Sequence, residues 1–579
     1  MPPEMARIAI VLIVAAFVVA LAARGISAWE CGAAGPQEVR YISIAQGLLG
    51  GRGFEGIDKR FPDIIQPPLH ELMLAVAIAV VGDPLLAGRS LTVLLGALLV
   101  FPAGLLAWRM YGPRTAWRAA WLVAVYPLLI HFSGIALTEP VFGLLVAVAV
   151  VFLQGVVSGR SPGLRGSALA GVALGLGFLD RPEGLAYLLA AALFLFLTAW
   201  LPLRRGIGTA ALWSAALAGA FLAFAIPYSV WLHTRTGHWR VSPKAVLTQV
   251  HNMIMTEGIK EHWPEKEGTS VFYERVKFGL NADATDLRSS EAFRALGLLP
   301  SNGAPTEKVS LIGDVIQPTF LVRVVLRNFR ILYLDTLKYG LVLPTLFMGL
   351  LALGIASEPW RAGPDRRSRL LLAWFLLAGC SWALSYVQGR FLYASIGLAV
   401  VWIARGWVRL EEWMHGSFMQ SPRLNSPATR AAATVLLSVI FSATSLAHAV
   451  PPVKVTRNLW HDNRIAGKEL RKIAPEGSPV MALTPIVSFY ADLPFEMLPY
   501  ADVQDVLKYA HHQGVRYLAV HVATFQIQRP QLEVLTHPEQ APAGLKEILH
   551  TGDPGHERFI VYELSDAAGA PREDATPAE

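Results

Sequence analysis

The chain has 579 residues, of which 54% are hydrophobic and only 16% are charged, whereas ordinary soluble domains carry about 25% charged residues. Its apolar residues come in blocks close to the length of about 20 that crosses a bilayer, which excludes a soluble globular protein. The net charge of +7 does not indicate a nucleic-acid partner, because the arginines lie in short loops between apolar blocks, where they set membrane orientation.

The apolar blocks predict an all-α polytopic membrane domain over residues 1–450, with about eleven transmembrane helices. The first block is interpreted as an uncleaved signal anchor. Expected spans follow at about 8–28, 85–108, 119–136, 141–157, 167–180, 184–203, 208–232, 339–357, 370–387, 391–408 and 431–450. The loops "WRMYGPR" and "SGRSPGLRG" are rich in arginine and are assigned to the cytoplasm.

Residues 29–84 are expected to form the first external loop. Within it, Val39, Ile42 and Ala45 recur at helical spacing, which predicts a surface helix that begins at Pro36 and ends before two glycines. The following block, "PPLHELMLAVAIAVVGDP", is too short for a span and is expected to lie along the outer membrane surface.

Two further regions are expected on the same external side. Residues 233–338 form a long aromatic loop, and a loop of that length is usually functional or disordered. Residues 451–565 contain the strand-like runs "SPVMAL", "FEMLPY", "RYLAVHV" and "RFIVYEL" and the helical run "DVQDVLKYAHHQG", which predict a small C-terminal extracytoplasmic α/β domain. Residues 566–579 are expected to be a disordered tail.

Charged residues at a membrane boundary often serve function, and a set of them falls on the expected outer face. Each also has a plainer interpretation: a first-turn glutamate, a helix start, a snorkelling arginine, a water-exposed histidine or a loop aspartate. An external pair of arginine forks suits phosphate. No P-loop, Rossmann or HExxH motif is present, which argues against nucleotide chemistry. The set comprises Glu38, Arg40, Asp63, His70, Glu139, Arg181, Glu183, His233 and Arg390.

Five motifs occur in order: "QEVRYISIAQGLLGGRGF", "QPPLHELML", "LTEPVF", "LDRPEGL" and "GRFLYASIGL". In this order the chain resembles the GT-C superfamily of membrane glycosyltransferases. Within that superfamily it is similar to the bacterial relatives of dolichyl-phosphate-mannose–protein mannosyltransferases and of lipid A aminoarabinose transferase. The resemblance covers about residues 5 to 410. It implies a donor that is a sugar linked to polyprenyl phosphate, an outward-facing cavity and a catalytic acid in the first loop.

The chain departs from the family at the acidic pair, where Gln37 stands in place of aspartate. An amide cannot act as a base, so the resemblance shifts the catalytic role to Glu38, with Glu139 and Asp63 as further candidates. A leaving phosphate needs arginines or a divalent metal; whether a metal takes part stays open. The substrate-binding residues implied are Gln37, Arg40, Tyr41, His70, Arg181, Glu183 and Arg390.

The expected function is transfer of a sugar from a polyprenyl-phosphate donor to a glycan, lipid or protein acceptor, at the outer face of the inner membrane and in contact with its lipids. Two alternatives remain. One is a transporter or flippase of a lipid-linked sugar, although paired halves with broken helices are not evident. The other is a silent member that binds the sugar lipid without cleaving it.

Overall fold

The computed structural model describes residues 3–55, 66–200, 206–236, 239, 318–339, 342–360, 365–380, 388–417, 426–499, 501–553 and 556–565. Asp63, most of the loop 233–338 and the tail 566–579 lie outside these residues. The described chain forms two compact units. The first falls within Met1–Cys31, Gln66–Ser242 and Leu321–Val455, and the second within Gly32–Ile65, Pro243–Phe320 and Thr456–Glu579.

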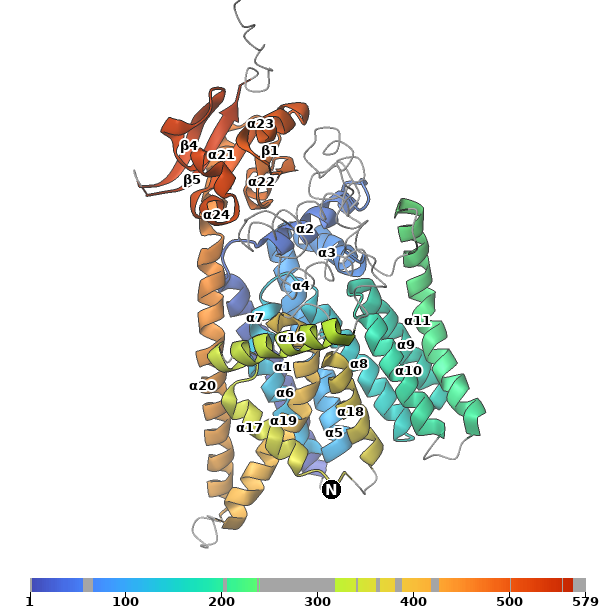
Figure 1. Cartoon of the computed structure of the whole chain (residues 1–579). Coiled ribbons are helices and arrows are strands. Elements are labelled where there is room, and N and C mark those ends of the chain that lie inside the picture. Colours follow the sequence, from blue (N-terminus) through green and yellow to red (C-terminus); the bar gives the residue numbers. More distant parts are fainter. Residues whose placement is uncertain are drawn as a thin grey trace, which may run out of the picture. The chain divides into compact units, whose positions relative to one another are not determined.

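The first unit is made of helices (Figure 1). Six stretches of the described residues are long and apolar enough to cross a membrane, and three shorter apolar helices accompany them, which confirms an all-α polytopic membrane domain. Its elements, some of which extend past the unit's limits, are α1 (Pro3–Glu30), α3 (Leu69–Val81), α4 (Pro84–Leu98), α5 (Val100–Tyr111), α6 (Pro113–Val125), α7 (Pro127–Ser133), α8 (Glu139–Val157), α9 (Gly163–Asp180), α10 (Gly184–Trp200), α11 (Gly206–Thr236), α16 (Pro318–Tyr339), α17 (Thr345–Ala356), α18 (Arg366–Gly379), η2 (Gly389–Leu392), α19 (Tyr393–Ser417) and α20 (Pro427–Leu459).

The expected single span at 119–136 is two helices, α6 and α7, joined at Tyr126. Pro127 has no backbone N–H, so the carbonyl of Val123 loses its partner four residues along the helix. The fully buried Arg24 of α1 replaces that partner: its Nη2 donates to Val123 O at 2.8 Å and its Nη1 to Ala124 O at 3.1 Å. A break inside the bundle is therefore stabilised by a side chain from another helix, as an apolar surrounding requires.

Helix α20 runs farther than the sequence suggested. Its expected end was at residue 450, before two prolines, but it continues through Pro451 and Pro452 to Leu459. Proline fixes φ near the helical value, so it removes hydrogen bonds and distorts a helix without always ending it.

The second unit contains a five-stranded sheet in the order β2-β1-β3-β5-β4. Strands β2 (Phe495–Met497), β1 (Val480–Ala482) and β3 (Tyr517–His521) are parallel, whereas β5 (His556–Leu564) is antiparallel to β3 and to β4 (Leu545–Asp553). Successive side chains of β3 enter different cores, as the period of a strand requires: Leu518 and Val520 one, Tyr517 and Ala519 the other. This sheet confirms the expected C-terminal α/β fold.

The helices of this unit are α21 (His461–Ile473), α22 (Ile486–Ala491), α23 (Val503–His512) and α24 (Val522–Gln528), with η3 (Pro530–Thr536) and η4 (Pro538–Gln540). The surface helix expected in the first loop is also present, as α2 (Pro36–Leu49). It packs against α22 of the sheet unit. Just before α2, the backbone N–H of Ala34 donates to the hydroxyl of Tyr490 at 2.8 Å. The part of the first loop that carries α2 thus shares one compact unit with the C-terminal domain.

Candidate functional site: a charged corner of the first unit

Several predicted site residues meet where three helix ends of the first unit lie together. Glu139 opens α8, directly before Pro140, which favours the first helical turn. Asp180 is the last residue of α9, and Arg181 leaves the helix in an extended conformation with φ of −148°. An extended residue is what a following proline favours, here Pro182. The charged side chains therefore sit at helix ends because these prolines fix where the helices begin and stop.

Arg181 donates hydrogen bonds to three other residues of this corner. Its Nη1 donates to Glu139 Oε1 at 2.7 Å and to Thr138 Oγ1 at 3.3 Å, and its Nη2 donates to Glu183 Oε1 at 2.8 Å. The Nε of Arg390, from η2, lies 3.6 Å from the same Glu139 Oε1. One carboxylate thus contacts the guanidinium groups of both Arg181 and Arg390.

Aromatic rings cover the two guanidinium groups. Arg181 lies 5.0 Å from the ring centroid of Phe391 and 5.8 Å from that of Phe142, and Arg390 lies 5.3 Å from that of Phe391. Rings at this range attract cations and exclude water. The side chain of Arg390 is 15% exposed and that of Arg181 only 5%, so Arg390 is the more accessible of the two.

Asp180 is a member of the corner that the sequence analysis missed. It is 1% exposed, and neither carboxylate oxygen accepts a hydrogen bond from any described residue. A buried carboxylate without such bonds is costly, and one that persists in a native structure calls for an explanation. The available clue was an acid at the very end of an apolar helix, inside the motif "LDRPEGL".

His70 and Glu71 of α3 belong to the same region. His70 was given the plainer interpretation of a water-exposed residue, but it is fully buried, and Glu71 is 1% exposed. The interpretation of His70 was wrong because a helix along the membrane surface was expected to leave this side chain in water, whereas His70 and Glu71 both lie on the buried face of α3. Glu71 was also missed by the sequence analysis, although it adjoins His70 in "PPLHE".

The remaining predicted residues lie in α2, in the second unit. Glu38 is 1% exposed, and its Oε2 accepts a hydrogen bond from the backbone N–H of Gly35 at 2.9 Å. In a capping box, the side chain at the third helical position accepts a hydrogen bond from the backbone N–H of the N-cap residue, so Glu38 stabilises the start of the helix. Gln37 is exposed, Arg40 half-buried and Tyr41 buried. The structure does not describe Asp63.

A divalent metal would need several oxygen, nitrogen or sulfur ligands grouped together. Within the part of the chain that the structure describes, no three His, Cys, Asp or Glu side chains are grouped to hold one. Glu139 Oε1 is already engaged by Arg181 and Arg390. The described residues of this corner therefore do not form a metal-binding set.

Comparison with known proteins adds sequence relatives. Residues 65–231 match a family described as dolichyl-phosphate-mannose-protein mannosyltransferase. An undecaprenyl phosphate-alpha-4-amino-4-deoxy-L-arabinose arabinosyl transferase from Pseudomonas aeruginosa (strain LESB58) is 33% identical over 216 residues, 35% of this chain and 38% of that protein. The enzyme numbered 2 from Pseudomonas fluorescens is 29% identical over 220 residues, 35% of each chain. The chain therefore matches little more than a third of the length of these curated relatives.

Solved structures extend the likeness over nearly the whole chain. ArnT from Cupriavidus metallidurans bound to undecaprenyl phosphate has a TM-score of 0.55 at 15% identity, covering 97% of this chain and 99% of that one. The Archaeoglobus fulgidus oligosaccharyltransferase tethered to an acceptor peptide has a TM-score of 0.57 at 14% identity, covering 98% and 75%. The fold is thus that of the GT-C membrane glycosyltransferases.

In its fold, and in part of its sequence, the chain is similar to the GT-C glycosyltransferases that its motifs indicated. Among the proteins compared, its sequence is similar to the bacterial aminoarabinose transferases over a segment of 216 residues. Glu139 and Arg181 fall inside the segment that matches the mannosyltransferase family.

Proposed function

We propose that the protein is an integral membrane glycosyltransferase that moves a sugar from a polyprenyl-phosphate donor to an acceptor on the outer face of the inner membrane. The observation that carries the proposal is the pair of arginines around Glu139 at the helix ends of the first unit. Arginine forks match phosphate geometry. The relatives named for undecaprenyl phosphate and dolichyl phosphate support a lipid phosphate as the bound group.

The two arginines are assigned different tasks. Both Nη atoms of Arg181 are engaged by neighbouring carboxylates, so Arg181 acts as a positioning residue that fixes the corner. Arg390 is more exposed than Arg181, and its Nε lies 3.6 Å from Glu139 Oε1. Arg390 is therefore proposed to contact the donor phosphate directly and to stabilise its growing charge as it leaves.

The proposed reaction is one displacement. A carboxylate takes the proton of an acceptor hydroxyl, the hydroxyl oxygen bonds to the anomeric carbon, and the bond from that carbon to the phosphate oxygen breaks. The bonding electrons leave with polyprenyl phosphate. A single displacement inverts the configuration at the anomeric carbon.

Glu38 is proposed as the base, on the family resemblance of the first loop. Glu139 suits the role less, because its charge is shared between two guanidinium groups. Asp180 is the second candidate, because its buried oxygens accept no hydrogen bond from the described residues. Glu38→Gln and Asp180→Asn separate the two candidates.

Turnover in proteoliposomes tests the function. The donor is a polyprenyl-phosphate sugar radiolabelled in the sugar, offered with a cell-envelope extract as acceptor. Transfer predicts that label leaves the lipid while free polyprenyl phosphate accumulates in equal amount. Labelled lipid that crosses the bilayer intact would instead favour a flippase, and stable binding without cleavage would favour a silent member.

The orientation in the membrane is part of the proposal. The arginine-rich loops are assigned to the cytoplasm, so the C-terminal domain is proposed to be extracytoplasmic. A cysteine at the exposed Lys472, in a chain lacking Cys31 and Cys380, should react with a membrane-impermeant maleimide in intact spheroplasts. A cysteine at Arg160 in an assigned cytoplasmic loop is the matched control and should react only after lysis. The reverse pattern overturns the orientation.

A further inference from the structure

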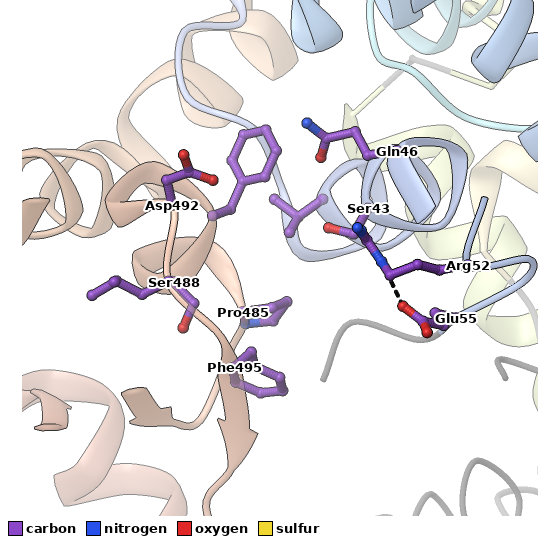
Figure 2. Close-up of a pocket in the computed structure, with 11 residues that line it drawn as sticks. Ser43, Gln46, Arg52, Glu55, Pro485, Ser488, Asp492 and Phe495 are labelled. Carbon is purple, nitrogen blue, oxygen red and sulfur yellow. Dashed lines mark hydrogen bonds and ion pairs between the residues drawn. The ribbon is translucent and has the colours of Figure 1, made fainter. Parts of the chain in front are cut away.

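A cavity of about 270 Å³ lies within the second unit (Figure 2). One wall comes from α2 and the residues that follow it, and the other from α22 and the segment that leads into β2. Ligand pockets for drug-sized molecules usually measure about 300–1,000 Å³, so this cavity suits a ligand near the size of one sugar ring. The lining residues used below are Ser43, Gln46, Arg52, Ser488, Phe489 and Phe495.

The charges that line the cavity are already matched. Arg52 Nε lies 2.6 Å from Glu55 Oε2, as the dashed line in Figure 2 marks. The carboxylate of Asp492 lies 3.3 Å from Arg471 Nη2. The polar lining that remains is uncharged: the hydroxyls of two serines and one amide, Gln46. Such a lining suits neutral hydroxyl groups better than a phosphate or an ammonium group.

One of these hydroxyls indicates a ligand independently. Ser488 is 2% exposed, and its Oγ makes no hydrogen bond with any described residue. Buried polar atoms in native proteins nearly always have a partner. Since Ser488 lines the cavity, a hydroxyl group of a bound molecule can supply that partner.

The cavity wall that carries Ser488 includes a residue in the left-handed backbone conformation. Asp492, which directly follows α22, has φ of 57°, the only positive value for a residue other than glycine in the described chain. Aspartate tolerates this conformation better than most residues, yet it still carries strain, and such strain clusters at ligand sites. The turn leads the chain from Ser488 to Phe495, both of which line the cavity.

We propose that this cavity binds one uncharged pyranose ring of the acceptor glycan, an inference that rests on the proposed transferase function. The hydroxyl and amide groups would bond to the ring hydroxyls, while Phe489 and Phe495 would cover its C–H face. The lipid-linked donor is a poorer occupant for two reasons. Its lipid chain belongs with membrane-spanning helices, and all six candidate membrane spans of the described residues lie in the first unit. Its phosphate would need a cation, but the cavity's guanidinium is bound to Glu55.

Saturation-transfer difference NMR on the full-length protein in nanodiscs tests the site. The probes are N-acetylglucosamine, which is neutral, and glucose 6-phosphate, which is anionic, each at about 10 mM to detect Kd values in the millimolar range. Ser43→Trp places a bulky ring at the cavity wall. Leu49→Trp adds the same ring to an exposed position of the same helix, outside the lining. Ser488→Val removes only the buried hydroxyl.

The neutral sugar should give a signal with the parent protein and with Leu49→Trp. Its signal should fall at least about tenfold with Ser43→Trp, because the ring fills the space, and several-fold with Ser488→Val, because a hydrogen bond is lost. The anionic sugar should give a much weaker signal throughout. Equal signals from Ser43→Trp and Leu49→Trp, or equal binding of both sugars, would overturn the proposal.

Donor cleavage is measured on the same preparations, so that two failures can be told apart. If the parent cleaves the donor but no neutral sugar binds, the cavity proposal is wrong and the transferase function stands. If the sugar binds as expected but the parent never cleaves a donor, the acceptor assignment is overturned together with the transferase function.

Discussion

Arg24 and Arg181 are both almost fully buried in the first unit, yet their partners differ in kind. Arg24 donates to two backbone carbonyls at the helix break before Pro127 and to the hydroxyl of Ser133. Arg181 donates to two carboxylates and lies beside Asp180, whose oxygens accept no hydrogen bond in the described chain. The comparison teaches that a buried arginine in a membrane domain does not by itself mark a functional site. A neighbouring buried polar group whose oxygens accept no hydrogen bond is the better indication.

The largest expected effect is on the rate of transfer. Glu38→Gln should reduce it by about 10²–10⁴, the usual loss when a general base is removed, while the protein still inserts and binds donor. Gln37→Asp should keep or raise the rate. Single-turnover measurements at saturating donor give both values. A parent-like rate for Glu38→Gln moves the base to Asp180, and Asp180→Asn should then show the loss.

Arg24 should matter for stability and not for the donor. Arg24→Leu leaves the carbonyls of Val123 and Ala124 without partners and should lower the free energy of unfolding by about 2–5 kcal/mol. Thermal unfolding in detergent measures this, with Arg165→Leu at an exposed position of α9 as the control. If Arg24→Leu unfolds like the control but loses donor binding, the two arginines do not differ as described.

Arg390, in contrast to Arg24, should matter for donor binding and not for stability. Arg390→Lys keeps the charge but loses the planar fork, so donor affinity should fall about tenfold or more, which corresponds to about 1.4 kcal/mol. The unfolding temperature should change little, because the side chain is partly exposed. Equilibrium binding of polyprenyl phosphate measures the effect, and Arg160→Lys in an exposed loop is the control. Unchanged affinity would return Arg390 to the role of a snorkelling helix-end residue.

The smallest effect expected concerns the stability of the Asp180 variant. Asp180→Asn replaces a buried carboxyl group that has no hydrogen bond from the described residues, so the free energy of unfolding should stay within about 1 kcal/mol of the parent or rise. A residue kept only for structure would lose stability on the same change. Chemical unfolding followed by tryptophan fluorescence decides between them, with Asp83→Ala, which removes the N-cap of α4, as a variant that should be destabilised.

Much of the fold could be predicted from the sequence, because membrane spans and surface helices follow from local patterns. The helix from Pro36 to Leu49 was predicted almost to the residue, since its boundaries are a proline and two glycines. Strand β4 was missed because its sequence, "LKEILHTGD", is charged and lies at the edge of the sheet, where alternation is weak. The break at Tyr126 also escaped, since it depends on Arg24 from a distant helix.

The site was predictable in part for the same reason. The motifs supplied Glu139, Arg181 and Arg390, which the structure brings together. Burial of Asp180 and His70 depends on how separate helices pack, and no local pattern encodes that. The capping bond of Glu38 could have been anticipated from a glutamate at the third position of the helix.

The most direct test of the central proposal is donor cleavage by the purified parent protein beside the Arg390→Lys variant, each reconstituted in liposomes with a radiolabelled polyprenyl-phosphate sugar and acceptor extract. We expect the parent to release polyprenyl phosphate and transferred sugar in equal amounts, and the variant to do so at least about tenfold more slowly at limiting donor. Intact sugar lipid after prolonged incubation with the parent, or equal cleavage by both proteins, would contradict the proposal that this arginine corner binds the donor phosphate for transfer.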